Sequence, residues 1–568
     1  KNPPATRIKI KEETMTINIG QSERTTQNRV VALFCEKLGY RYLGNLQGLA
    51  NKNIREADLL AWLAKRGVSD ALAQSAVKSL QDLNHLGGGR RLYDANGDIY
   101  QLLRYGAKVK MGVGEQTQTV WLVDWENPQN NDFSVAEEVS IPGSQYDKRP
   151  DVVLYLNGIA VAVLELKRSS VSVSEGIRQN IANQQREFCE TFFTTVQLLF
   201  AGNDSEGLRY GVIETPEKYY LKWKEDGAPD NLGDLDADLS HVCEKSRFLE
   251  ILHDFMVFDN GAKKTCRPNQ YFGIKAAQAR LNQRQGGIIW HTQGSGKSLT
   301  MVWLAQWILE RGGNHRVLII TDRTELDEQI KKVFDHTQNE IYRTKSGKDL
   351  LNVLNENEHS LICSLVHKFG SREETEVEND AELNDFLNNI RTAKGGFSPK
   401  GKIVVFVDEC HRTQSGKLHE AMKSLLPDAI FVGFTGTPLL KTDKKQSVEV
   451  FGGFIHTYKF NEAVKDGVVL DLLYEARDIE QSLSSRKRVD DWFDVKTRGM
   501  TDIAKTQLKQ RWGTMQKLLS SKNRLEKIVD DILLDMETKP RLSAAMRFWF
   551  APASMRRVNV MSYLPKAV

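Results

Sequence analysis

Between residues 288 and 434 the chain alternates short apolar runs with segments whose apolar residues recur at helical spacing. The runs are rich in β-branched residues and cover Ile288–Trp290, Arg316–Asp322, Ser360–Leu365, Lys402–Asp408 and Ala429–Phe434. Such runs are typical of strands in a parallel sheet that is covered on both faces, with helices as crossovers. The pattern predicts an α/β fold here, with functional residues at the carboxyl ends of the strands.

The residues before this region have a more mixed pattern. Helices are expected over Ser22–Leu38, with Ser22 as a capping residue, and over Glu56–Arg66 and Asp70–Leu83, because apolar residues keep a helical period there. Strands are expected over Tyr100–Lys110, Thr117–Asp124, two parts of 151–167, Val196–Ala201, Tyr210–Ile213 and Tyr219–Trp223. These elements predict a separate α/β domain. Helix-spaced apolar residues follow over Phe248–Phe258, and an amphipathic helix is expected within Thr506–Met536.

The segment Ile288–Thr300 has the composition of a phosphate-binding loop between a strand and a helix. Its loop residues are Gly294, Ser295, Gly296, Lys297 and Ser298. Glycines let backbone N–H groups curl around phosphate oxygens, and the positive end of the new helix faces the same anion. Lys297 is predicted to reach the β- and γ-phosphates and Ser298 to hold Mg²⁺, so ATP and Mg²⁺ are the expected cofactors. His291 stands where the common pattern has its first glycine.

A second chemical centre is predicted within residues 151–167. Two apolar strands flank Asn157-Gly158, the strongest short signal for a β-hairpin. Glu165 and Lys167 are two residues apart and therefore share a face, while Asp151 begins the partner strand. Two carboxylates and a lysine at the open end of a hairpin are suited to hold Mg²⁺ and to break a phosphodiester.

The register of this hairpin decides whether the three side chains meet. A two-residue loop pairs residue 150 with 165 and places Asp151 on the face opposite Glu165. A three-residue loop, with Gly158 as a left-handed bulge, pairs 155 with 159 and brings Asp151, Glu165 and Lys167 to one face. We expect that bulge, or one elsewhere in the hairpin. The alternative is an ordinary buried hairpin with charged residues at its end.

Asp151, Glu165 and Lys167 match the PD-(D/E)xK nuclease motif, and a helicase-like motor follows in the chain. In this order the two parts resemble the restriction (R) subunit of type I restriction enzymes. The resemblance implies an ATP-dependent DNA translocase joined to a Mg²⁺-dependent endonuclease, which cuts unmodified double-stranded DNA away from its recognition site. It also implies methyltransferase (modification) and specificity subunits as partners, because this chain shows no domain that reads a target sequence.

The same resemblance extends to a helix after the hairpin. The family carries a Gln-x-x-x-Tyr motif there, which implies a catalytic role for Gln179 and leaves Asn183 in the position of the tyrosine. Related nucleases add an acidic residue from an early helix, for which Glu23 is the candidate. The alternative role for Glu23 is a first-turn glutamate that favours the helix dipole.

Motor motifs of superfamily 2 helicases are matched at several places. Gln270 lies where such motors read adenine, and its amide can hydrogen-bond in both senses. Asp408-Glu409-Cys410-His411 resembles a DEAD/DEAH-type box, in which Asp408 completes the Mg²⁺ shell and Glu409 orients the attacking water. Further resemblances, to motifs III, Ia and Ib, fall on Thr435-Gly436-Thr437-Pro438, Thr321-Asp322-Arg323 with Leu326, and Ser364.

These motifs suggest a division into four parts. We expect a PD-(D/E)xK endonuclease domain over 1–225, a connector over 226–260, a RecA-like motor lobe over 261–465, and the start of a second lobe over 466–568. Superfamily 2 motors complete the ATP site with arginines from motifs V and VI, and neither is found before Val568. We therefore expect an N-terminal fragment of an R subunit. The tail from Arg541 onward has no acidic residue and no predicted fold.

Composition narrows the setting further. The net charge is only +4, so binding of DNA must come from local basic surface. Six scattered cysteines without a C-x-x-C pair disfavour a zinc site and a disulfide framework and fit a reducing cytoplasm. No apolar run approaches the length of a membrane span, so no membrane partner is expected.

Two alternatives remain open from the sequence. One is a type III restriction subunit or a repair helicase–nuclease, although type III proteins usually place the nuclease after the motor. The other is a truncated ATP- and DNA-binding fragment without turnover.

Overall fold

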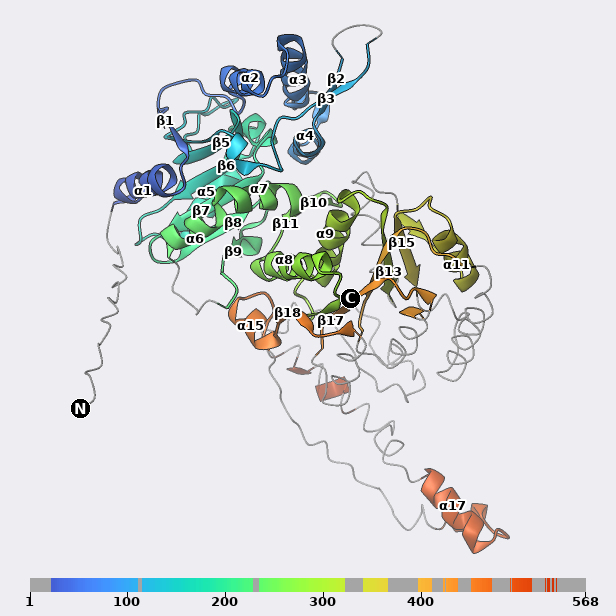
Figure 1. Cartoon of the computed structure of the whole chain (residues 1–568). Helices are drawn as coiled ribbons and strands as arrows, with labels where there is room; N and C mark the ends of the chain where they lie inside the picture. Colours follow the sequence, from blue (N-terminus) through green and yellow to red (C-terminus); the bar gives the residue numbers. More distant parts are fainter. Residues whose placement is uncertain are drawn as a thin grey trace, which may run out of the picture. The chain divides into compact units, whose positions relative to one another are not determined.

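The computed structural model describes residues 22–110, 115–227, 234–321, 341–365, 397–410, 422–437, 451–471 and 491–512, apart from positions 424 and 492, with a few residues between 527 and 538. The chain forms two compact units, Lys1–Leu470 and Asp471–Val568. The second unit is represented mainly by helix α17 (Asp502–Trp512), which begins four residues before the predicted stretch Thr506–Met536 and overlaps its start. Both sheets discussed below belong to the first unit (Figure 1).

The first sheet has seven strands in the order β1-β4-β5-β6-β7-β8-β9. Their bounds are Arg41–Asn45, Phe133–Glu137, Val152–Leu156, Ile159–Leu166, Leu198–Asn203, Gly207–Gly211 and Leu221–Lys222. The β1–β4 and β6–β7 pairs are parallel and the other pairs are antiparallel. The central hairpin β5–β6 is buried along its whole length, so it is held rigidly at the middle of the domain.

Helices pack around this sheet. They are α1 (Glu23–Ala32), α2 (Glu56–Lys65), α3 (Asp70–Leu83), α4 (Leu92–Tyr105) and α5 (Val173–Asn183), with short helical turns η1 (Leu33–Lys37), η2 (Gly87–Gly89), η3 (Pro128–Asn130), η4 (Glu190–Thr194) and η5 (Glu217–Tyr219). The predicted helices over 22–38, 56–66 and 70–83 are confirmed, and the Ser22 hydroxyl caps α1 by accepting from the Thr25 N–H.

The strand predicted over Tyr100–Lys110 is wrong. Helix α4 runs through Tyr105, because Leu92, Ala95, Ile99 and Leu103 give it one buried face. Gly106, with φ of 76°, ends the helix, and only β2 (Ala107–Val109) follows. The strand predicted over Thr117–Asp124 is reduced to β3 (Gln118–Val120), which pairs with β2.

The segment predicted as a connector is largely folded. It contains α6 (Leu235–Val242), α7 (Lys245–Asp254) and β10 (Met256–Asp259), and β10 pairs with β11 (Ala262–Thr265). One of the acidic residues that suggested a linker is a helix cap, because the Asp234 carboxylate accepts a hydrogen bond from the Ala237 N–H at the start of α6. Apolar residues of α6 and α7 join one hydrophobic core with residues of both sheets.

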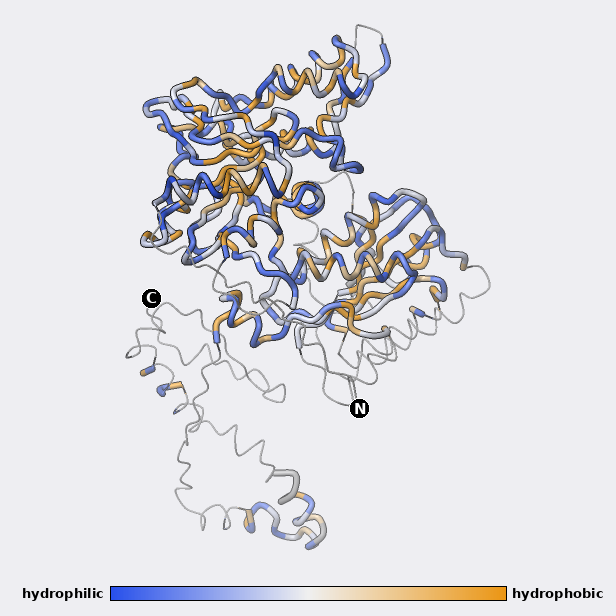
Figure 2. The backbone as a smooth tube through the Cα atoms, turned by 60° about the vertical axis from the view of Figure 1, so that its left-hand side comes forward, coloured by the Kyte–Doolittle hydropathy of each residue, from blue (hydrophilic) through white to orange (hydrophobic). Residues whose placement is uncertain are grey.

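The second sheet has seven strands in the order β14-β15-β13-β16-β17-β12-β18, and every pair is parallel. In that order they span Ile341–Arg343, Leu361–Leu365, His315–Thr321, Lys402–Val407, Ile430–Thr435, Gly287–His291 and Phe454–Tyr458. The helices here are α8 (Pro268–Asn282), α9 (Lys297–Glu310), α11 (Gly347–Asn355) and α15 (Phe460–Lys465). The predicted parallel sheet is confirmed. Figure 2 shows hydrophobic stretches along the strands of both sheets.

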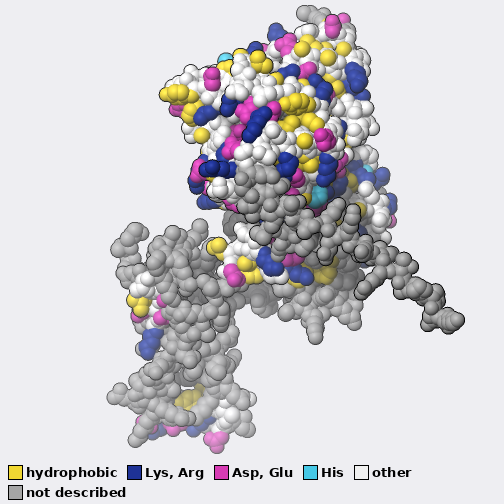
Figure 3. Space-filling model, turned by 90° about the vertical axis from the view of Figure 1, so that its left-hand side faces the viewer, with side chains coloured by type: hydrophobic (Ala, Val, Ile, Leu, Met, Phe, Trp, Pro, Cys, Tyr) yellow, Lys and Arg dark blue, Asp and Glu magenta, His cyan; other side chains and the backbone are white. Residues whose placement is uncertain are grey.

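On the described part of the face drawn in Figure 3, neither basic nor acidic side chains form a large continuous patch. On the face drawn in Figure 3, basic and acidic side chains are interspersed among polar and apolar ones, in keeping with the net charge of +4. None of the helices that the structure describes has both the length and the apolar character needed to cross a membrane.

Candidate functional site

The hairpin β5–β6 has a bulge, but not at the expected position. Leu156 pairs with Ile159 across a two-residue turn, in which Asn157 and Gly158 both have positive φ, as a type I′ turn requires. The three-residue loop is therefore wrong. The extra residue lies farther along β6, where Tyr155 pairs with Ala160 and Leu154 with Ala162, and the alternative of a bulge elsewhere in the hairpin is confirmed.

The shifted register sets the acidic residues opposite each other. Val152 pairs with Leu164, so the next position along places Asp151 opposite Glu165. The Asp151 Oδ2 atom accepts a 2.7 Å hydrogen bond from the Leu166 N–H and lies 3.9 Å from the Lys167 Nζ atom. Glu165 is fully buried and Asp151 is 9% exposed. The structure thus brings Asp151, Glu165 and Lys167 together at the end of a rigid hairpin.

The electrostatics of this cluster are unfavourable for two bare carboxylates. Burial raises the pKa of Asp151 to about 6, although Lys167 and the Leu166 N–H act in the opposite direction. Burial and then the neighbouring Asp151 carboxyl raise the pKa of Glu165 well above its ordinary value. A divalent cation between the two groups would offset both effects, because it restores a counter-charge to the ionised pair.

The donor set fits a hard cation such as Mg²⁺. Glu165 Oε2 is a buried oxygen that has no hydrogen-bond partner within the part of the chain that the structure describes. Buried carboxylate oxygens are ordinarily satisfied, and an orphaned one calls for an ion or water. Asp151 and Glu165 offer the oxygen ligands that Mg²⁺ prefers.

The other predicted residues around the hairpin have different outcomes. Glu23, at the start of α1, places its Oε1 atom 3.5 Å from Lys167 Nζ and so reaches the cluster. Gln179 is half-buried on α5. Asn183, which occupies the position of the family's tyrosine, donates from Nδ2 to Glu165 Oε1 at 3.1 Å. Sequence reasoning did not assign Asn183 a role, and its only signal was its spacing of four residues from Gln179.

The phosphate-binding loop lies at the carboxyl end of β12, as predicted. Gly294 and Gly296 have φ of 83° and 91°, and α9 begins at Lys297. The Ser295 hydroxyl donates to the Thr292 carbonyl at 2.5 Å and tightens the turn. Ser298 is half-buried in the first turn of α9. The backbone therefore has the form of a loop that receives an anion at a helix N-terminus.

His291, in place of the usual glycine, is part of a buried contact between strands. Its Nε2 atom lies 2.8 Å from His456 Nδ1 on the neighbouring strand β18, and the His456 Nε2 atom lies 3.5 Å from an Asp226 carboxylate oxygen. Burial, followed by the charges of His456 and Lys297, lowers the pKa of His291 well below its ordinary value. The side chain is thus neutral and serves packing between β12 and β18.

Acidic and hydroxyl groups gather at the same sheet edge. Asp408 and Glu409 directly follow β16 and are 7% and 5% exposed. The Thr321 hydroxyl, at the end of β13, donates to Asp408 Oδ2 at 3.4 Å. Glu409 has φ of 46°, an uncommon conformation for a glutamate that is typical of functional turns.

The turn after β17 contacts the phosphate-binding loop. A Cβ atom at Gly436 would lie 2.6 Å from Lys297 Nζ and 3.2 Å from the Gln293 nitrogen. A larger residue at this position would displace the Lys297 side chain or press on the backbone at Gln293. The parallel strands thus bring Lys297, Asp408, Glu409 and Gly436 to the carboxyl ends of the strands, where these residues can surround a nucleoside triphosphate with its metal ion.

Gln270 lies close to this loop but both ends of its amide are engaged. Its Oε1 atom accepts from the Arg267 N–H at 2.8 Å and caps α8, while Nε2 donates to the Gly296 carbonyl at 2.8 Å. The structure therefore places Gln270 against the phosphate-binding loop rather than in an open base-binding position.

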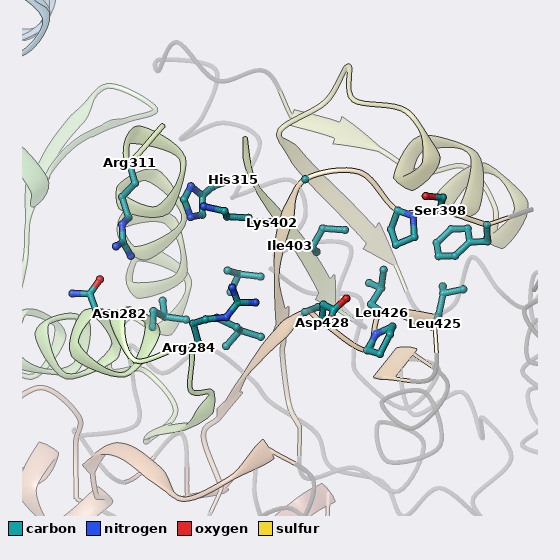
Figure 4. A pocket seen from close by; sticks show the side chains of 18 residues that line it. Asn282, Arg284, Arg311, His315, Ser398, Lys402, Ile403, Leu425, Leu426 and Asp428 are labelled. Atoms are coloured by element: carbon teal, nitrogen blue, oxygen red, sulfur yellow. The ribbon is translucent and has the colours of Figure 1, made fainter. Parts of the chain in front are cut away.

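A separate cavity of about 710 Å³ lies at the opposite edge of the second sheet. It is lined by residues at the amino ends of β13, β16 and β17, among them His315, Lys402 and Ile430. Figure 4 shows Arg284, Lys402 and Asp428 around it. Because the strands are parallel, this cavity is remote from the phosphate-binding loop and is not the nucleotide site.

Several predicted residues lie outside the part of the chain that the structure describes. These are Asp322, Arg323, Leu326, His411, Pro438 and the tail from Arg541. Thr321, Ser364 and Thr435 are described and lie in or at the ends of strands of the second sheet.

Two family models match separate parts of the chain. Residues 20–218 match the model described as type I restriction enzyme R protein N terminus (HSDR_N), and residues 269–506 match the SWI2/SNF2 ATPase model. The first match contains the hairpin cluster, and the second contains the phosphate-binding loop and the acidic strand end. The resemblance to R subunits and the superfamily 2 motor fold are confirmed by these matches.

Curated relatives are similar over most of this chain. The type I restriction enzyme HindI endonuclease subunit of Haemophilus influenzae is 28% identical over 513 residues, which cover 83% of this chain and 46% of that protein. A relative from Methanocaldococcus jannaschii, named provisionally as such a subunit, is 25% identical over 574 residues, which cover 92% of this chain and 52% of that protein. The chain thus spans about half the length of these relatives.

Among solved structures, the Sulfolobus solfataricus SWI2/SNF2 ATPase core in complex with dsDNA is 16% identical and covers 46% of this chain and 44% of its own length, with a TM-score of 0.25.

Proposed function

We propose that this chain, which joins the N-terminal domain of type I restriction enzyme R proteins to a SWI2/SNF2 ATPase domain, acts as the motor and endonuclease of a type I restriction enzyme. It would translocate double-stranded DNA with ATP hydrolysis and cut unmodified DNA away from the recognition site. Modification and specificity subunits would supply recognition. The observation that carries this proposal is the meeting of Asp151, Glu165 and Lys167 in a domain that precedes a phosphate-binding loop and the acidic residues Asp408 and Glu409 at one sheet edge.

In the nuclease, Asp151 and Glu165 would hold Mg²⁺, which when bound polarises the phosphodiester and supplies a reactive water. Lys167 lies within 4 Å of Asp151 and can steady the negative charge that develops on the cleaved phosphate. Glu23 orients Lys167 through its 3.5 Å ion pair. Gln179, on the flank of α5, would contact the DNA strand.

In the motor, Lys297 would bind the β- and γ-phosphates and the loop N–H groups from Gly294 to Ser298 would cradle them. Ser298 and Asp408 would hold the Mg²⁺ that accompanies ATP, and Glu409 would accept the proton of the attacking water. Gln270 would read adenine after releasing its present hydrogen bonds. The Lys297 Nζ atom lies beside Gly436, so the turn after β17 would sense the γ-phosphate.

A double dissociation tests the two activities in a complex assembled with modification and specificity subunits. Asp151→Ala is expected to lower Mg²⁺-dependent nicking of supercoiled plasmid at least a hundredfold, because it removes a metal ligand, and to leave ATP-driven translocation unchanged. Lys297→Ala is expected to abolish nucleotide binding and translocation. Asp147→Ala is the matched control, since Asp147 is an exposed acid four residues from Asp151.

The proposal is wrong for the nuclease if Asp151→Ala cuts as well as the Asp147→Ala control. It is wrong for the motor if Lys297→Ala binds ATP with unchanged affinity. These two outcomes are independent, so either half of the proposal can fail alone.

A further inference from the structure

Asn183 makes a direct and fully buried contact with the proposed metal ligand Glu165. The Asn183 Nδ2 atom donates to Glu165 Oε1 at 3.1 Å, and the two side chains are 1% and 0% exposed. This hydrogen bond engages one carboxylate oxygen, while the other, Oε2, has no hydrogen-bond partner among the described residues. The Asn183 amide therefore makes the two carboxylate oxygens of Glu165 different, because it binds Oε1 and leaves Oε2 available to a ligand.

The reach of Asn183 depends on the close approach of α5 to the sheet. A Cβ atom at Gly176 would lie 3.2 Å from the Ala201 Cβ and 3.4 Å from the Glu165 carbonyl oxygen, so glycine lets the helix sit against β6 and β7. One turn on, the Asn180 amide donates to the Phe200 carbonyl at 2.8 Å and fixes the helix to β7.

This geometry limits the size of the side chain that fits at position 183. Gly176, Asn180 and Asn183 lie on one face of α5 at helical spacing, and all three are buried. With the helix backbone so close, a short amide spans the distance to Glu165, whereas a phenol ring at position 183 would need more room.

We propose that Asn183 is a positioning residue for the metal site, which holds Glu165 Oε1 so that Oε2 is presented to the cation. This inference rests on the proposed function, because it assumes that Glu165 binds metal. Partners of metal ligands fix the ligand's orientation, and their loss typically weakens metal affinity by roughly ten- to a hundredfold.

The experiment measures binding of Mn²⁺ to the nucleotide-free full chain by electron paramagnetic resonance, so that it does not depend on cleavage. Asn183→Leu keeps the size of the side chain but removes the donor, and it is expected to weaken Mn²⁺ binding roughly ten- to a hundredfold. Asn180→Leu is the matched control, because it removes an equally buried amide from the same helix without touching Glu165. Because Asn180 fixes α5 to β7, this variant reports the effect of loosened helix packing alone, and its Mn²⁺ affinity is expected to fall less than that of Asn183→Leu.

A conservative variant guards against a folding defect. Asn183→Gln retains an amide donor and is expected to bind Mn²⁺ more tightly than Asn183→Leu. In the assembled complex, saturating Mg²⁺ is expected to restore most of the nicking rate of Asn183→Leu, because a positioning residue changes metal affinity more than the chemical step.

The outcomes separate this inference from the proposed function. If Asp151→Ala and Glu165→Ala abolish the Mn²⁺ site and Asn183→Leu binds as wild type does, the role of Asn183 is refuted and the metal site stands. If Asn183→Leu and Asn180→Leu are weakened equally, the effect is one of helix packing and the inference is also refuted. If the wild-type chain has no Mn²⁺ site that needs Asp151, the proposed nuclease site itself is refuted.

Discussion

Replacing Asp151 by asparagine should stabilise the metal-free protein at the expense of its activity. Asp151 is 9% exposed, and Glu165, in the neighbouring position of the hairpin, is fully buried. An asparagine has nearly the same shape, can still accept from the Leu166 N–H, and can donate its own N–H to the Glu165 carboxyl. The substitution therefore removes a buried charge without removing the contacts around it.

The size and sign of the effect follow from the pKa of Asp151. Burial raises this pKa from 3.8 to about 6 in the folded chain. Between these two values the folded state binds more protons than the unfolded state, so the free energy of unfolding falls as the pH rises through this window. The full difference corresponds to about 3 kcal/mol, and it persists above pH 6. Asp151→Asn should recover roughly 1–3 kcal/mol at pH 8 and almost none at pH 4.

Thermal unfolding followed from pH 4 to pH 9 in the presence of a chelator measures this prediction. The variant should unfold a few degrees above wild type at pH 8 and at the same temperature at pH 4, with Asp147→Asn as an exposed control. Adding Mg²⁺ should then raise the unfolding temperature of wild type but not that of the variant. A variant that is less stable than wild type at pH 8, or whose effect does not change with pH, would refute the reasoning.

Three further substitutions test packing and the motor. The Arg104 side chain is 1% exposed, and its guanidinium donates to both Glu310 carboxylate oxygens. Glu310→Ala removes this ion pair and should lower the free energy of unfolding of the first unit by roughly 3 kcal/mol in denaturant unfolding. An unchanged midpoint would contradict this. Gly436→Ala places a methyl group 2.6 Å from Lys297 Nζ and should displace this lysine and weaken ATP binding in calorimetric titration, whereas equal affinity would show that Lys297 or the turn moves aside. Gly158→Ala adds a methyl group 2.9 Å from the Leu59 nitrogen at a residue with φ of 84°. It should lower the unfolding temperature by several degrees in a thermal melt, and an unchanged midpoint would contradict this.

The elements that sequence predicted well are those whose apolar pattern has one interpretation. The buried runs that became β12, β13, β16 and β17 are continuous and β-branched, and a parallel sheet is the arrangement that covers both of their faces. Helix α3 matched its predicted bounds because its apolar face repeats for four turns. Because a parallel sheet brings the carboxyl ends of its strands to one edge, the edge that carries Lys297 and Asp408 was also predictable.

Other features depend on tertiary packing that the sequence does not display. Tyr100 and Tyr105 are residues that favour strands, yet both belong to α4. The bulge in β6 falls in a run of alanine and valine residues, where no local composition marks the extra residue. The role of Asn183 depends on the close approach of α5 to β6. Gly176 permits this approach, but a glycine in the sequence does not by itself predict it. Gln270 was assigned to adenine, and its engagement with Gly296 became visible only in the folded chain.

The bonds made by Gln270 have a consequence for how a nucleotide would be selected. A purine that takes up this amide must first detach it from the Gly296 carbonyl, which belongs to the loop that would grip the phosphates. Recognition of the base and binding of the phosphates would then be coupled. With a pyrimidine triphosphate, the Gln270 amide would stay bound to the Gly296 carbonyl, and the phosphate-binding loop would stay attached to α8. The wrong base would then weaken binding at the phosphates and not only at the base.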